Sequence, residues 1–236
     1  MRLHDPIDAA TLLYFHGGGY IFGNPGTHRQ FIAHLVEATG TEAYAPPYRL
    51  APEFRFPAAV EDGLASYQAL LDRGVDPASL IVCGDSAGGG LAMATLHRAR
   101  RMGMPLPGGV ILFSPYLDLR HSAYTIPINA ATDYLPLSEL SKPNERYASS
   151  DQLDNPEVSP LRADLTGFPR MLIFAGGAEM ILDDAVRLKG NADAAGFDAT
   201  LIIKPEMMHV WPAIVPWQEA SHRTMAQCAK WIEEGI

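Results

Sequence analysis

Cysteine is scarce in this chain, and long apolar runs are missing. The two cysteines, Cys83 and Cys228, are too few for a disulfide framework, and Cys83 falls in an apolar stretch where a small buried thiol is expected. No uninterrupted apolar run approaches the roughly 18 residues that a membrane span requires. Residues 1–6 contain no apolar stretch of the signal-peptide kind. These absences predict a cytoplasmic protein without a membrane span.

Basic residues are also few, because 18 lysines and arginines stand against 27 aspartates and glutamates, for a formal net charge of -9. A nucleic-acid partner would require a basic face, so the composition argues against one. The histidines show no spacing typical of a metal site, and no phosphate-binding glycine loop is present. The sequence therefore indicates neither a nucleic-acid partner nor a bound metal.

What the chain does contain is a regular alternation of short apolar runs with helical segments. Six runs are expected to be strands, namely 11–15, 41–45, 80–83, 109–113, 171–175 and 200–203. This alternation predicts an α/β fold, with a mostly parallel sheet of about six strands and helices on both faces. No linker is visible, so residues 1–236 are expected to form a single domain. Between 116 and 168 the periodicity weakens, and we expect this insertion to form a lid or pocket wall.

The strongest chemical signal lies in residues 80–90. The apolar run ends in Gly84-Asp85-Ser86-Ala87-Gly88, and a helix rich in Ala, Leu and Arg is expected to follow. Strand, G-x-S-x-G turn and helix are the sequence form of a nucleophile elbow, which would expose the Ser86 hydroxyl on a strained turn. A glycine-serine turn that merely joins a strand to a helix is the alternative.

Several reactive groups follow different expected strands. Ser86, Glu179, His209 and the glycine-rich residues 16–19 each come just after an apolar run, and the carboxyl ends of parallel strands meet at one edge of a sheet. The chain order of nucleophile, acid and histidine matches that of serine hydrolases on this topology. We expect His209 to accept the Ser86 proton and return it to the leaving alcohol, while Glu179 orients the imidazole.

Backbone groups near these residues are expected to complete the site. The N–H groups of Gly17, Gly18 and Ala87 are the expected oxyanion hole, in which losing one donor typically costs about 2.7–4 kcal/mol. Taken alone, the glycine run is more typical of a flexible turn. Tyr20 and Trp211 are expected to line the substrate pocket, although aromatic core packing fits them nearly as well.

Five motifs together resemble the hormone-sensitive lipase family of α/β-hydrolases, in its bacterial esterase branch. In the family's order they are 16–19 (His-Gly-Gly-Gly), 48–53 (Tyr-Arg-Leu-Ala-Pro-Glu), 84–89 (Gly-Asp-Ser-Ala-Gly-Gly), 159–161 (Ser-Pro-Leu) and 209–211 (His-Val-Trp). The resemblance implies hydrolysis of small, short-chain carboxylic esters through an acyl-enzyme intermediate. It also implies that no metal and no organic cofactor take part.

Two features depart from the family's pattern. The family commonly has Asp at the acid position with a second Asp four residues on; Glu179 and Asp183 keep that spacing, so Glu179 is the expected acid, with Asp118, Asp183 and Asp184 as rivals. Only fifteen residues precede His16, where family members usually carry cap helices. The N-terminal cap is therefore expected to be reduced or absent and the pocket open. A homodimer that covers the open sheet edge or the pocket would fit, and so would a truncated fragment.

Other functions stay open at this point. A lactonase or a deacetylase would use the same triad and differ only in the shape of its pocket. A non-catalytic small-ligand-binding relative is the alternative of a different class. Such relatives of this family have lost the catalytic histidine, whereas this chain retains His209.

Overall fold

A computed structural model describes residues 10–140 and 146–235 of the chain. Its sheet has six parallel strands in the order β2-β1-β3-β4-β5-β6. The strands are β1 (Thr11–Phe15), β2 (Glu42–Tyr44), β3 (Leu80–Asp85), β4 (Gly109–Phe113), β5 (Met171–Gly176) and β6 (Ala199–Lys204). The predicted α/β fold with a parallel sheet of about six strands is confirmed.

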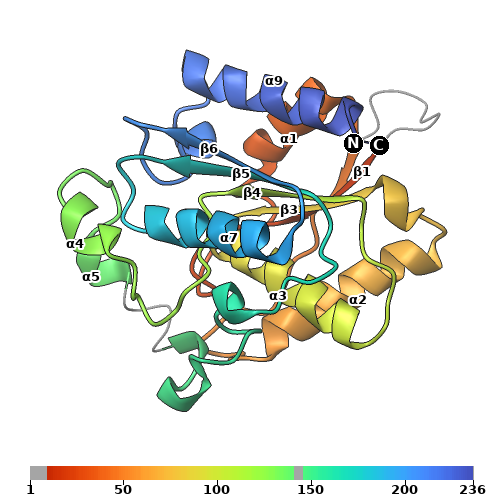
Figure 1. Ribbon diagram of the computed structural model, residues 1–236, viewed down its shortest axis with the longest axis horizontal. Helices are drawn as coiled ribbons and strands as arrows, with labels where there is room; N and C mark the ends of the chain where they lie inside the picture. Colours follow the sequence, from red (N-terminus) through yellow and green to blue (C-terminus); the bar gives the residue numbers. More distant parts are fainter. Residues whose placement is uncertain (1–9, 141–145, 236) are drawn as a thin grey trace.

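Helices cover both faces of this sheet (Figure 1). The α-helices are α1 (Arg29–Thr39), α2 (Ala58–Asp72), α3 (Ala87–Arg101), α4 (Thr125–Asn129), α5 (Leu137–Leu140), α7 (Leu182–Ala195), α8 (Trp211–Ile214) and α9 (Glu219–Glu233). Short 3₁₀ turns are η1 (Pro77–Ser79), η2 (Ser150–Gln152) and η3 (Pro160–Arg162). Figure 1 shows α1 and α9 together on one side of the sheet and α2, α3 and α7 on the other. None of the described helices is both long and apolar enough to cross a membrane.

The alternation of side chains along each strand explains why both faces are covered. Leu13 and Val82 point into a core shared with α2, α3 and α7, whereas their neighbours Leu12 and Ile81 point into a second core that includes α1 and α9. All four side chains are buried. Strands that are apolar at every position therefore require a helical layer on each side.

The insertion at 116–168 contains α4, α5, η2 and η3, joined by irregular chain. Figure 1 places α4 and α5 together beyond one end of the sheet. That this insertion acts as a lid stays a prediction. The expectation about an N-terminal cap concerns the start of the chain, where residues 1–9 lie outside the described residues.

Candidate active site

Ser86 occupies the sharp turn between β3 and α3. Its backbone has φ 49° and ψ -120°, a combination that non-glycine residues rarely adopt. The turn is held because the Ser86 N–H donates to the carbonyl of Phe113 at 2.9 Å. Gly88 must be a glycine, since a Cβ there would lie 2.0 Å from the carbonyl oxygen of Phe15. Helix α3 thus packs directly against the end of β1, next to the strained turn that carries Ser86.

The structure brings Ser86, His209 and Glu179 into one hydrogen-bonded chain. His209 Nε2 lies 2.9 Å from Ser86 Oγ, and His209 Nδ1 lies 3.2 Å from Glu179 Oε2. Ser86 follows β3, His209 follows β6 and Glu179 follows β5. The ends of these parallel strands bring the three side chains together, as expected from the sequence. With Nδ1 protonated toward the carboxylate, Nε2 is free to accept the serine proton.

Burial and charge act in opposite directions on His209. Burial alone would lower the pKa of its imidazole, because the charged form is poorly solvated inside the protein. The hydrogen bond and negative charge of Glu179 outweigh this effect, with smaller contributions from Asp133 and Asp85, so the pKa of His209 is raised overall. The surroundings therefore favour the protonated, imidazolium form of His209.

Ser114 holds the backbone beside His209 in place, and this residue was not predicted from the sequence. Val210 has a left-handed backbone (φ 51°), and its N–H donates to Ser114 Oγ at 2.9 Å. Ser114 is fully buried and follows β4 directly. Its position after a buried strand was the available signal, since it is the same signal that identified Ser86 and His209.

The Gly17 amide does not have the predicted role. It donates to Asp85 Oδ1 at 2.9 Å, so it is already engaged and cannot also serve a substrate oxyanion. Within the described residues, the amides of Gly18, Gly19 and Ala87 have no hydrogen-bond acceptor. Gly18 and Gly19 have positive φ angles of 117° and 61° and line the same cavity as Ser86.

Asp85 ties the glycine loop to the elbow. Besides the Gly17 amide, its carboxylate accepts the Tyr14 hydroxyl at 2.5 Å and lies 3.4 Å from His28 Nε2. Burial alone would raise the pKa of Asp85, but the hydrogen bond and positive charge of His28 lead the groups that bring it below its usual value. For His28 the signs are reversed: burial alone would lower the pKa of its imidazole, but the hydrogen bond and negative charge of Asp85 raise it above its usual value. The buried carboxylate therefore stays charged and fixes the loop.

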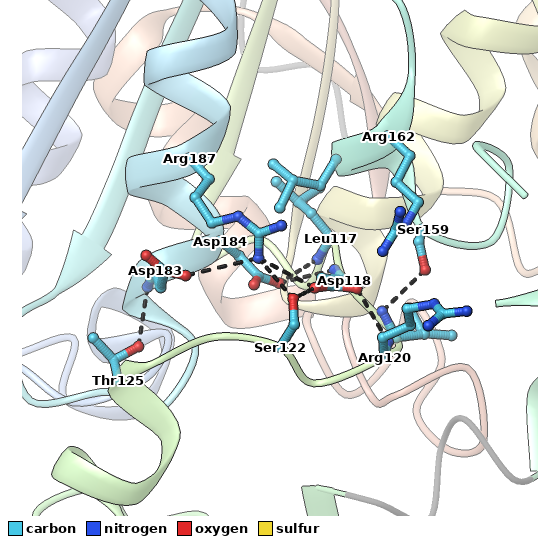
Figure 2. A network of polar contacts seen from close by, with 12 residues as sticks. Leu117, Asp118, Arg120, Ser122, Thr125, Ser159, Arg162, Asp183, Asp184 and Arg187 are labelled. Atoms are coloured by element: carbon cyan, nitrogen blue, oxygen red, sulfur yellow. Dashed lines mark hydrogen bonds and ion pairs between the residues drawn. The ribbon is translucent and has the colours of Figure 1, made fainter. Parts of the chain in front are cut away.

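The three rivals of Glu179 are bound elsewhere (Figure 2). Asp184 accepts the amides of Leu117 and Asp118 at 2.8 and 3.0 Å. Asp118 and Asp183 lie 3.2 and 3.7 Å from the guanidinium of Arg187. Figure 2 shows this network at the start of α7, where it joins the helix to the chain that follows β4. These carboxylates serve the packing of α7 and not the histidine.

A cavity of about 520 Å³ opens beside the serine and the histidine. Part of its wall comes from the 116–168 insertion, through Tyr116, Tyr134, Leu135 and Leu140. Much of the remaining lining is also apolar, which suits the hydrocarbon part of a small ligand. In the described ranges, no group of three or more His, Cys, Asp and Glu side chains is arranged to hold a metal ion.

Tyr20 and Trp211 do not line this cavity, contrary to prediction. Tyr20 is buried, and its ring stacks on Tyr147 with centroids 4.0 Å apart. Trp211 is completely buried in the core between the sheet and α9, where its ring meets Phe174 edge-on. Both belong to core packing because the chain turns their side chains away from the cavity.

A family model described as alpha/beta hydrolase fold matches residues 12–213 of this chain. An acetyl-hydrolase of Streptomyces hygroscopicus is 42% identical over 205 residues, which cover 86% of this chain and 69% of that protein. An esterase of Acinetobacter venetianus is 33% identical over 226 residues, which cover 94% of this chain and 75% of the esterase.

Solved structures give the same result. The crystal structure of a hormone-sensitive lipase from a metagenome library superposes with a TM-score of 0.91 at 39% identity, over 94% of this chain and 75% of that one. EstE5 soaked with p-nitrophenyl butyrate gives a TM-score of 0.92 at 39% identity, over 96% and 76%. The chain thus belongs to the α/β-hydrolase family, and these similarities confirm the resemblance to bacterial hormone-sensitive lipases and esterases that its motifs carry.

Proposed function

We propose that this protein is a serine carboxylesterase that hydrolyses small carboxylic esters through an acyl-enzyme intermediate. The observation that carries the proposal is the hydrogen-bonded chain from Ser86 through His209 to Glu179, which ends at an apolar cavity. Relatives described as an esterase and an acetyl-hydrolase support the same reaction class.

The reaction starts with the proton of Ser86. As Oγ attacks the ester carbonyl carbon, His209 Nε2 takes the proton and the carbonyl oxygen becomes an oxyanion. When the tetrahedral intermediate collapses, the C–O bond to the alcohol breaks and His209 returns the proton to the leaving alcohol. A water molecule then repeats the sequence on the acyl-enzyme, which releases the carboxylic acid and restores Ser86. Glu179 orients the imidazole and stabilises the imidazolium in both halves.

We assign the stabilisation of the oxyanion to the backbone N–H groups of Gly18, Gly19 and Ala87. Gly19 replaces Gly17 because the Gly17 amide already donates to Asp85. The support for this set is that the three amides have no acceptor within the described residues and that Gly18 and Gly19 line the cavity. Preorganised donors of this kind stabilise the charge without reorganising during the reaction.

Hydrolysis of p-nitrophenyl butyrate by the wild type and by Ser86→Ala tests the proposal. We expect turnover that disappears with the serine hydroxyl, together with stoichiometric trapping of the wild type by a serine-directed fluorophosphonate. A folded wild type that neither turns over the ester nor reacts with the fluorophosphonate would favour the non-catalytic binding protein. The contact of His209 with both of its partners argues against that alternative.

Acetyl esters are a specific second candidate because the Streptomyces relative is described as an acetyl-hydrolase. A deacetylase, and equally a lactonase, would use the same three residues. Comparison of kcat/KM for p-nitrophenyl acetate, butyrate and a long-chain ester distinguishes an acetyl preference from a broader one. A higher value for the long-chain ester would contradict the short-chain expectation.

Two further points stay predictions. The first is a cytoplasmic location, for which fractionation of the source cells is the test. The second is a homodimer that covers a sheet edge or the pocket. The outer strands available for it are β2 and β6. Sedimentation velocity of the purified chain would separate a monomer from a dimer.

A further inference from the structure

The loop that carries the catalytic acid is held by side chains from a distant segment. We name residues 177–183 the acid loop and residues 125–133 the bracing segment. Asn129 of the bracing segment donates through Nδ2 to the carbonyl oxygen of Gly177 at 3.1 Å and to that of Glu179 at 2.8 Å. The backbone of the acid residue itself is therefore bound by the bracing segment.

Two threonines extend the same pattern. Thr125 Oγ1 donates to the carbonyl of Met180 at 2.7 Å and accepts the amide of Asp183 at 3.1 Å, the second of which is drawn in Figure 2. Thr132 Oγ1 donates to the carbonyl of Ala178 at 3.0 Å. Each contact joins a side chain of the bracing segment to the backbone of the acid loop. Such an arrangement fixes the loop without depending on the loop's own side chains.

Asp133 is the charged member of the bracing segment. Its Oδ2 accepts the amide of Met180, the residue next to Glu179, at 2.8 Å. Its Oδ1 is buried and has no hydrogen-bond partner among the described residues. A buried carboxylate oxygen without a partner is costly unless a positive charge compensates it. The adjacent Tyr134 lines the catalytic cavity, and its ring centroid lies 6.4 Å from that of His209.

The groups that surround His209 indicate which positive charge compensates the carboxylate of Asp133. Three carboxylates act on its imidazole, from Glu179 in the acid loop, Asp85 at the end of β3 and Asp133 in the bracing segment, and each favours the protonated ring. The other neighbours, Ser86 and Tyr134, carry no charge when protonated. Asp85 is already paired with His28, whereas Asp133 has no cation among its recorded contacts in the described chain. The charge that arises near Asp133 during the reaction is the His209 imidazolium.

We propose that Asp133 is a positioning residue for catalysis, which braces the acid loop beside Glu179 and adds a second negative charge that stabilises the His209 imidazolium. The inference rests on the proposed function for its catalytic consequence. Asp133 acts through Glu179 and His209, and contact with the substrate is not part of its role.

Asp133→Asn separates the two parts of this role, because asparagine keeps an acceptor for the Met180 amide and loses the charge. The expected result is a kcat about tenfold lower and an acid limb of the kcat/KM profile moved down by roughly half a pH unit. Asp133→Ala, which also removes the acceptor, should lose more activity. Glu206→Gln is the matched control, since it removes an exposed carboxylate three residues before His209 and should leave both readouts unchanged.

Titration of His209 by NMR of ring-labelled histidine provides a readout that needs no substrate. We expect its pKa to fall in Asp133→Asn and to stay at the wild-type value in Glu206→Gln. If both aspartate variants lose activity while the histidine titration stays in place, Asp133 is only a structural acceptor and the inference is overturned. Wild-type kcat and titration in Asp133→Asn would overturn it as well. If the wild type hydrolyses no ester but the titration moves, the esterase proposal fails and the charge effect of Asp133 stands.

Discussion

Glu179 is completely buried, and its two carboxylate oxygens differ sharply in their surroundings. Oε2 contacts His209 Nδ1, while Oε1 has no hydrogen-bond partner among the described residues. Among the described residues, the carboxylate of Glu179 therefore has His209 as its hydrogen-bond partner and no other through its side chain. A neutral side chain of the same shape would keep the packing and lose the interaction with the imidazolium.

Glu179→Gln should consequently lower kcat by roughly 10³–10⁴-fold with little change in KM, because the lost interaction is strongest in the transition state. Steady-state kinetics on p-nitrophenyl butyrate measure this loss. Asp118→Asn is the comparison, since Asp118 pairs with Arg187 and not with the histidine. Near-full activity in Glu179→Gln together with its loss in Asp118→Asn would reverse the assignment of the acid.

At this scale the sequence indicated which side chains lie together at one edge of the sheet better than it indicated the contacts of each group. Ser86 and His209 could be selected because each follows an apolar run, and parallel strands end at one edge. Gly17 and Trp211 were assigned wrongly for a different reason. Which acceptor an amide already uses, and toward which side a ring turns, depend on the packing of distant segments such as Asp85 and Phe174.

The geometry of the turn between β3 and α3 depends on the absence of a side chain at Gly88. The close approach of α3 to the end of β1 leaves no room for a side chain at Gly88, where a Cβ would lie 2.0 Å from the Phe15 carbonyl and 2.6 Å from that of His16. Both obstacles are backbone atoms, which cannot rotate away. The helix and the glycine loop would have to separate.

Gly88→Ala should therefore destabilise the protein by about 1–3 kcal/mol or more and reduce kcat, because the separation moves the glycine loop, residues 16–19, relative to Ser86. Thermal unfolding and ester hydrolysis measure the two effects. Gly190→Ala in α7 is the control, since within the described residues a Cβ there would meet no atom within 4 Å apart from the surrounding backbone of its own helix. It should stabilise the helix by roughly 0.5–1 kcal/mol. Equal behaviour of the two variants would contradict the close approach.

Elements with a strong period were predictable, and those without one were not. The expected runs 11–15 and 109–113 coincide with β1 and β4, because short runs that are almost entirely apolar have few other stable positions. The bracing segment showed only a weakening of periodicity. Its helix α4 has only five residues, which is too short to leave a pattern, and its contacts with the acid loop are side chain to backbone. Physical contact with the acid loop, which the sequence cannot display, gives this segment its structure.

At the scale of the whole molecule, the buried Asp184 makes the free energy of unfolding depend on pH. Burial raises the pKa of this carboxyl from 3.8 to about 8, against the opposing effect of the two amides that it accepts. The folded protein thus keeps the proton to higher pH than the unfolded chain does. The resulting contribution is complete below about pH 4 and is lost as the pH rises through 8.

The free energy of unfolding should therefore contain a component that falls by up to about 1.4 kcal/mol per pH unit across that window. Asp184→Asn keeps an acceptor for both amides and cannot titrate. The unfolding free energy of the variant minus that of the wild type, measured by urea denaturation from pH 5 to pH 9, should increase with pH because only the wild type loses this contribution. A difference that is independent of pH would show that Asp184 has the same protonation in both states.

The bracing of the acid loop by side chains of residues 125–133 also determines the order in which the molecule opens. The bracing side chains Asn129 and Thr132 are not fully buried and contact the loop through hydrogen bonds, whereas the sheet is enclosed by two apolar cores. Local opening with a smaller free energy than global unfolding is expected for such a region. Added urea should then abolish activity at concentrations that leave the sheet intact, and amides of the acid loop should exchange with deuterium before those of β4.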